Sequence, residues 1–284
     1  MKKIFVLVAT LISSVSFGQT LAEGIRETTN ERHDISEQIF QKLITSNPTN
    51  AEFYFYQAEN FLIGDDKEEA KAAYEKAASL SATDNYAKLA AAKLSFINGD
   101  TTAAGTIMRE VLKTTKRKNP ELLRQIAATY SKLEVMNADV AISLLQEAIT
   151  LEPKNADNYL LLGDAQIINP RNASAAMKSY NLASDINNDA KAIVRKAHVY
   201  QRAKNANLAN EMFQTAIDLE PNYAPTYRAQ AELYMEYYQY NKAIPLWEKY
   251  ITLNDSDKAR YRYASSLFAA EQYEAALAQL VKLE

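Results

Sequence analysis

The chain has 284 residues, of which 48% are hydrophobic and 24% charged, a composition typical of folded proteins rather than disordered tails. Only 6 glycines and 7 prolines are available for turns, which disfavours a β-sandwich or barrel and favours helices. The formal net charge is −3 with no clustered basic excess, so nucleic-acid binding is not expected.

The absence of cysteine from the sequence excludes several kinds of site. Disulfides, thiolate metal centres, a cysteine nucleophile and attachment through a lipid-modified cysteine all require that residue. His33 and His198 are the only histidines in the sequence, too few for a histidine-rich metal centre. We therefore expect neither a metal nor a cofactor.

Residues 1–18 have the three-part pattern of a secretory signal peptide, with cleavage expected after Gly18. Lys2 and Lys3 precede the apolar run 4–12, and small residues occupy most of 13–18. The apolar run is about half of the roughly 20 residues that a membrane-spanning helix needs, so we do not expect an integral membrane protein. The alternative is a buried N-terminal helix. The pattern predicts export, to the periplasm or the cell surface of a Gram-negative bacterium.

Small and aromatic residues recur at intervals of 34 along the rest of the chain. A first set is Ala197, Tyr200, Ala209, Phe213, Ala216 and Pro221, and its counterparts are Ala231, Tyr234, Ala243, Trp247, Tyr250 and Asp255. An earlier set with the same internal spacing is Ala58, Phe61, Ala70, Tyr74 and Ala77. This pattern resembles the tetratricopeptide repeat, in which small residues and an aromatic ring of two antiparallel helices pack together.

The spacing of these residues explains why helices would pair. Ala197 and Tyr200 share one helical face, and Ala209, Phe213 and Ala216 share another. Small residues allow two helices to approach, and the ring fills the space beside them. Proline cannot continue a helix, so the second helices are expected to end at Asn47-Pro48, Asn119-Pro120, Pro153 and Pro221.

The predicted fold is all-α, a right-handed superhelical solenoid of stacked antiparallel helix pairs. About eight units are expected over residues 20–284, approximately at 20–50, 51–84, 85–119, 120–155, 156–189, 190–223, 224–257 and 258–284. The last unit reaches Glu284 with an apolar second helix and without the polar capping helix that a stack normally requires. Two explanations stay open: a truncated sequence, or a C-terminal end that docks onto a partner or onto a second copy as a homodimer.

The resemblance implies a concave face, lined by first helices, that binds a protein or peptide partner. The expected binding residues on this face are Lys191, Val194, His198, Arg202, Arg228, Glu232, Met235 and Arg262. Their basic members would suit an acidic segment or a terminal carboxylate, whereas a solvated helix face balanced by Glu232 is the alternative. Tyr237 and Tyr238 are further candidates, because neither is needed for repeat packing.

An enzymatic function is not expected. The sequence has no Gly-rich phosphate loop, no zinc-ligand spacing and no serine in a nucleophile elbow. The acidic pairs Asp65-Asp66 and Glu68-Glu69 lie where carboxylates favour a helix N-terminus. We therefore predict an exported, non-catalytic scaffold. The alternatives are an oligosaccharide-binding protein of the cell envelope built on the same repeats, and the helical half of a longer chain with an enzyme domain beyond Glu284.

Overall fold

The computed structural model describes residues 20–132, 137–168 and 172–283. The expected signal peptide at 1–18 and the final residue Glu284 lie outside these residues. In the described part all regular structure is helical, and the helices run in antiparallel pairs. They are α1 (Leu21–Thr29), α2 (His33–Ser46), α3 (Ala51–Gly64), α4 (Lys67–Leu80), α5 (Asn85–Ile97), α6 (Thr101–Thr114), α7 (Pro120–Lys132), α8 (Ala138–Leu151), α9 (Ala156–Ile167), α10 (Ala173–Ile186), α11 (Ala190–Arg202), α12 (Ala206–Leu219), α13 (Ala224–Glu236), α14 (Tyr240–Leu253), α15 (Asp257–Ala269) and α16 (Tyr273–Leu280), followed by a 3₁₀ turn at Val281–Leu283.

Polar residues start many of these helices. The side chains of Asn50, Asp84, Asn155 and Asp189 each accept a hydrogen bond from a backbone N–H in the first turn of the helix that follows. Each cap satisfies a donor that has no partner within the helix. These caps recur at the start of the first helix of a pair, so they fix where each new pair begins.

One expected helix end is wrong. Asn119-Pro120 does not close a second helix, because α6 already ends at Thr114 and Pro120 is the first residue of α7. The Asn119 side chain accepts a hydrogen bond from the backbone N–H of Leu122 and caps α7. Proline fits this first position, where its missing N–H would have had no helical partner.

The repeated small and aromatic residues form the core. Ala197, Ala209, Phe213 and Ala216 are fully buried, as are Ala231, Ala243 and Trp247 one repeat later. The buried residues form successive clusters along the chain rather than one central core. Each pair of helices therefore buries its apolar faces against its neighbours, as a solenoid requires.

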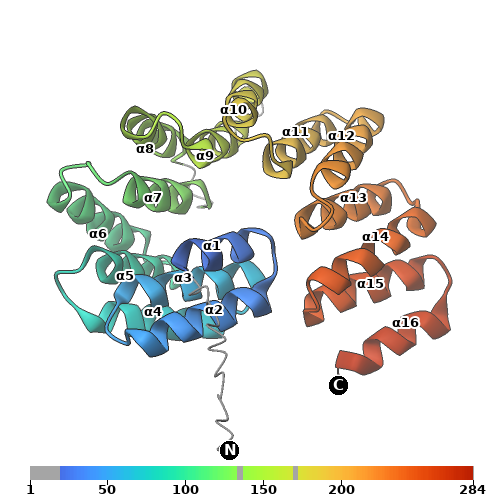
Figure 1. The fold of residues 1–284 in the computed structure, drawn as a ribbon, viewed down its shortest axis with the longest axis horizontal. Coiled ribbons are helices and arrows are strands. Elements are labelled where there is room, and N and C mark those ends of the chain that lie inside the picture. Colours follow the sequence, from blue (N-terminus) through green and yellow to red (C-terminus); the bar gives the residue numbers. More distant parts are fainter. Residues whose placement is uncertain (1–19, 133–136, 169–171, 284) are drawn as a thin grey trace, which may run out of the picture.

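The stack curves so far that its two ends meet. Figure 1 shows the helices arranged around a ring, with the turn between α1 and α2 facing the helices α13 to α15. The odd-numbered helices α7, α9, α11 and α13 lie on the inner side of this ring, and α8, α10, α12 and α14 on the outer side. Consecutive odd-numbered helices from α7 to α13 also contact each other. The stack therefore curves toward this inner row of helices. The curvature brings together residues from opposite ends of the chain.

Candidate binding site on the inner face and at the ring closure

The candidate site is built from positions that recur on the inner face, which we define as the side formed by α9, α11, α13 and α15. Val194, Arg228 and Arg262 occupy one repeat position at intervals of 34, and His198, Glu232 and Ser266 occupy another. In the last two repeats the first position is therefore basic. Because the same position in each repeat points to the same side of the solenoid, the curvature aligns these side chains in rows.

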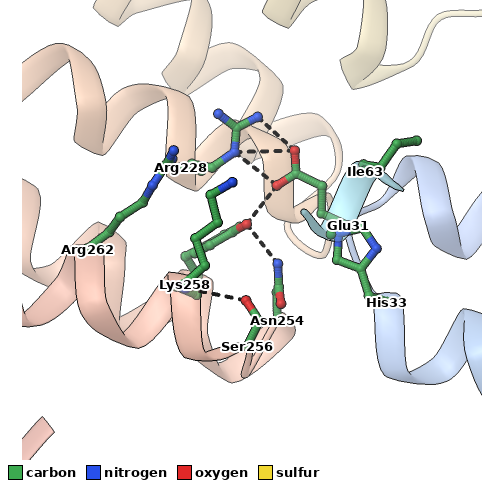
Figure 2. A pocket seen from close by; sticks show the side chains of 11 residues that line it. Glu31, His33, Ile63, Arg228, Asn254, Ser256, Lys258 and Arg262 are labelled. Carbon is green, nitrogen blue, oxygen red and sulfur yellow. Dashed lines mark hydrogen bonds and ion pairs between the residues drawn. The ribbon is translucent and has the colours of Figure 1, made fainter. Parts of the chain in front are cut away.

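Arg228 of α13 forms a bidentate ion pair with Glu31, which lies in the turn between α1 and α2 (Figure 2). The Arg228 Nη2 atom lies 2.7 Å from Glu31 Oε1, and Arg228 Nε lies 3.0 Å from Oε2. The Tyr250 hydroxyl of α14 donates to the same carboxylate at 2.8 Å and accepts from the Asn254 side chain at 2.7 Å. The first repeat thus places its carboxylate among donors of the seventh.

The electrostatic environment keeps Glu31 ionised. Burial alone would raise the pKa of the Glu31 carboxyl, but the hydrogen bonds and positive charge of Arg228 outweigh burial and hold the pKa below its ordinary value. Burial likewise opposes the charged form of Arg228, and the hydrogen bond and charge of Glu31 raise the pKa of the guanidinium instead. Each partner therefore stabilises the ionised form of the other.

A second ion pair joins the second repeat, which follows that of Glu31, to the eighth repeat, which follows that of Arg228. The Lys258 Nζ atom at the start of α15 lies 2.6 Å from Oδ2 of Asp65, in the turn between α3 and α4. Both side chains are about half exposed, at 45% and 50%, so water screens this pair more strongly than the first. The hydrogen bond and charge of Lys258 lower the pKa of Asp65. We call the two ion pairs, Glu31–Arg228 and Asp65–Lys258, together with Tyr250, the closure contact.

The two carboxylates of the closure contact come from equivalent positions of successive repeats. Glu31 and Asp65 are 34 residues apart and occupy the same turn position, as does Gly99 one repeat further. All three adopt positive φ angles, 55° at Glu31, 74° at Asp65 and 86° at Gly99. This left-handed conformation costs a residue with a side chain about 1–2 kcal/mol, and glycine adopts it freely. The first two repeats, which contact the C-terminal end of the solenoid, thus carry a carboxylate at this turn position. The third repeat has Gly99 there, which adopts the conformation freely.

A cavity of about 310 Å³ lies beside the closure contact. Figure 2 shows Arg228, Lys258 and Arg262 on its C-terminal wall, with His33 and Ile63 on the other side. Glu232 connects the basic side chains, because it accepts from Arg228 Nη1 at 3.1 Å and forms an ion pair with Arg262. Three cations and the Glu31 carboxylate thus line a space that is open to solvent.

The structure brings Arg228, Glu232 and Arg262 of the sequence-predicted residues into one network. His198 lies near them, and its ring packs edge-on against Phe213 at 5.4 Å between centroids. Burial lowers the pKa of His198, as do the positive charges of Arg228 and Arg195, and together they outweigh the Gln201 hydrogen bond and the charge of Glu232, which raise it. His198 is therefore neutral near pH 7 and serves first as a packing residue.

The other predicted residues lie outside this network. Val194 is buried in a core cluster, and Lys191 lies 3.9 Å from Asp157 of the preceding repeat. Arg202 is exposed at the end of α11. The indole N–H of Trp247 donates to the Met235 sulfur at 3.3 Å, so Met235 helps to pack α13 on α14.

The two candidate tyrosines differ from each other. Tyr237 is partly buried and packs against the core cluster that contains Phe213. Tyr238 is 80% exposed, has a positive φ of 59° and meets only the edge of Tyr240 among aromatic rings of the described residues. Tyr238 is therefore the tyrosine of this turn that presents a free surface.

Sequence reasoning missed Glu31, Tyr250 and Lys258 as site residues and interpreted Asp65 as a helix-start carboxylate. Glu31 and Asp65 look like ordinary turn acids, and Tyr250 was attributed to repeat packing. The recurrence of an acid at the same turn position of two repeats, and of arginine at the same position of two others, is the signal that could have suggested a pairing.

Two further observations concern the described residues as a whole. None of their helices is long and apolar enough to cross a membrane. Nor do three or more of their histidine, aspartate and glutamate side chains gather in a way that could hold a metal ion.

Comparison with known proteins identifies the repeat. Family models described as tetratricopeptide repeat match residues 51–84, 130–190 and 190–223. No curated protein matches the chain. A solved structure similar to it is a thermophilic tetratricopeptide repeat protein of Thermus thermophilus, with a TM-score of 0.53 and 22% identity over 65% of this chain and 100% of that one.

Two further solved structures are less similar. The Cut9–Hcn1 hetero-tetramer of the APC/C has a TM-score of 0.49 and 15% identity, over 90% of this chain and 48% of that one. MamA has a TM-score of 0.43 and 23% identity, over 60% of this chain and 97% of that one. Taken with the family matches and the stacked helix pairs, the comparisons lead to one conclusion: the chain contains tetratricopeptide repeats and folds as their superhelical solenoid.

Proposed function

We propose that this protein is an exported, non-catalytic scaffold that binds a protein or peptide partner along the inner face of its ring. The observation that supports this most strongly is the row of charged side chains at equivalent repeat positions, with Arg228 and Arg262 bridged by Glu232. Tetratricopeptide repeats are scaffolds for protein–protein interaction, and equivalent positions in successive repeats suit an extended partner.

The chemistry of the site supports recognition rather than catalysis. Its cations are mostly arginines, which do not release a proton in the physiological range, and they are engaged by Glu31 and Glu232. His198, which lies near these cations, is neutral and packed against Phe213. Paired guanidinium groups of this kind bind carboxylates with defined geometry but do not move protons.

A second copy of the chain is a further proposed partner, through the C-terminal end. Tyr261, Phe268, Leu277 and Val281 of the last repeat are each more than half exposed. Helical repeats bury such apolar faces against the next unit of the stack, and an equivalent face of a second copy would cover them as a homodimer.

The proposed location is the periplasm or the cell surface of a Gram-negative bacterium, and it rests on the signal-peptide pattern at residues 1–18. Crosslinking of the full-length tagged protein in its native envelope, followed by affinity capture, tests location and partner together. We expect a specific protein that is recovered with the wild-type chain and lost with the double variant Arg228→Gln/Arg262→Gln. Recovery of bound oligosaccharide, or equal recovery of a protein by both chains, would contradict the proposed role of the inner face.

A further inference from the structure

The basic side chains of the last two repeats already bind carboxylates, and these carboxylates belong to the chain itself. Arg228 holds Glu31 in a two-point arrangement, and Lys258 holds Asp65. The planar guanidinium group recognises any carboxylate with this geometry, whether it comes from the same chain or from a partner. Glu31 and Asp65 therefore occupy the positions that the carboxylates of an acidic partner would take.

The closure contact is polar, which makes it exchangeable. Within the described residues, the core clusters of the N-terminal repeats and of the last two repeats share no members. The ion pairs of Glu31 and Asp65 and the Tyr250 hydrogen bond join the two ends instead. An adjacent cavity of about 310 Å³, open to solvent, gives a competing group access to Arg228, Lys258 and Arg262.

Glu31 and Asp65 both lie in turns between helices and have positive φ angles of 55° and 74°, as Lys204, Tyr238 and Glu271 do in turns of later repeats. Their turns connect helices and lie at the tips of their repeats, so the repeats can move apart without breaking any helix. Only side-chain contacts need to be exchanged.

We propose that the closed ring is a self-occupied state of the binding face, in which Glu31 and Asp65 stand in for two carboxylates of an acidic partner segment. This segment would bind Arg228, Lys258 and Arg262 in place of Glu31 and Asp65, and its binding would open the ring. The inference rests on the proposed scaffold function and adds to it the chemistry of the partner and a means of regulation. Because only open molecules are competent to bind, closure weakens the apparent affinity by the fraction of molecules that are open.

The test uses a synthetic peptide with alternating glutamates as the acidic probe, and a peptide with glutamines in their place as the neutral probe. Affinity is measured by titration calorimetry, and ring opening by the radius of gyration from small-angle X-ray scattering. In the variant Glu31→Gln/Asp65→Asn both self-occupying carboxylates become neutral amides of nearly the same size. We expect it to have a larger radius and to bind the acidic probe about tenfold more tightly than the wild type.

Two further variants and the neutral probe separate the competing explanations. Glu147→Gln is the matched control, because Glu147 forms an exposed ion pair with Arg117 between neighbouring repeats, away from the closure contact. It should leave both the radius and the affinity unchanged. Arg228→Gln/Arg262→Gln should open the ring without gaining affinity, since it removes the cations themselves. The neutral probe should bind none of the variants.

The single substitution Asp65→Asn is included because Asp65 is about half exposed, so that this change should leave folding intact. Far-ultraviolet circular dichroism would reveal a folding defect in any variant. It should raise the affinity for the acidic probe by a smaller factor than the double variant. The inference is overturned if Glu31→Gln/Asp65→Asn expands the ring without tighter binding, or if the acidic probe binds none of the variants. Neither result would contradict the proposed scaffold function, which is tested separately by capture of a partner from the envelope.

Discussion

Glu31 and Arg228 are separated by 197 residues in the sequence and form a two-point ion pair that closes the solenoid. In an open stack of repeats each unit contacts only its neighbours, and stability is approximately a sum over adjacent pairs. The closure contact adds to this sum an interaction energy between the first two repeats and the last two. The two ends of the chain should therefore depend on each other for stability, through side-chain contacts rather than a shared apolar core.

Loss of the Glu31–Arg228 pair should release both ends together. We expect Glu31→Gln to increase hydrogen exchange at the α1–α2 turn and in α13 and α15, with little change in α9. The two side chains are only partly exposed, at 14% for Glu31 and 27% for Arg228, so the pair should couple in a double-mutant cycle by about 1–3 kcal/mol. Faster exchange confined to α1 and α2 would show that the ends are independent.

The closure should be lost in acid. The pKa of Glu31 and that of Asp65 are both lowered in the folded protein, so these groups contribute stability above their unfolded pKa values, near 4.5 and 3.8. This contribution disappears as the pH falls through the lower, folded pKa values. The radius of gyration should thus be constant from pH 8 to about pH 5 and rise below about pH 4. In Glu31→Gln/Asp65→Asn the radius should already be large at pH 7 and should lack this transition.

The fold was predictable because its cause is local. Ala197, Phe213 and their counterparts recur at a fixed interval, and each pair of helices buries its face against the adjacent pair. The closure contact was not predictable in the same way, since it depends on the curvature that accumulates over several repeats. No local pattern around Glu31 indicates which residue it will meet after 197 positions.

Repeat position also explains why three of the residues expected on the inner face lie together. Arg228, Glu232 and Arg262 were found from their repeat position, and the structure joins them in one network. Their role in partner binding stays a prediction. The same reasoning placed Val194 on the inner face, where a buried side chain lies instead. Repeat position specifies the side of the solenoid, whereas exposure depends on the neighbouring helices.

Gly163 should be required for packing in the fifth repeat. A methyl group added there would overlap the ring of Tyr180, which lies closer to this helix than a β-carbon allows. We expect Gly163→Ala to lower the free energy of unfolding by about 1–3 kcal/mol, measured by urea denaturation. Gly105→Ala is the matched control within α6. Its added methyl group would meet only the flexible end of Arg109 and the Tyr130 hydroxyl, so it should be neutral or stabilise by about 0.5–1 kcal/mol.

The C-terminal apolar face should mediate self-association. Leu277 on α16 is 62% exposed, and Leu182 on α10 is an exposed leucine far from that end, at 49%. We expect light scattering to detect a dimer for the wild type and for Leu182→Glu, and a monomer for Leu277→Glu. A wild-type chain that stays monomeric at high concentration would remove the second copy from the proposed partners.

The distance between the two ends of the closed ring can be measured directly. Because the sequence has no cysteine, spin labels can be attached to cysteines introduced at any chosen pair of sites. Labels at the exposed positions Gln38→Cys in α2 and Thr252→Cys in α14 report the distance between the two ends, and Thr215→Cys with Thr252→Cys serves as a reference within neighbouring repeats. Pulsed electron spin resonance should give a narrow, short distance for the first pair at neutral pH. That distance should lengthen and broaden when Glu31→Gln/Asp65→Asn is introduced, with the reference pair unchanged. An equally broad distribution before and after the substitutions would contradict the closure of the ring.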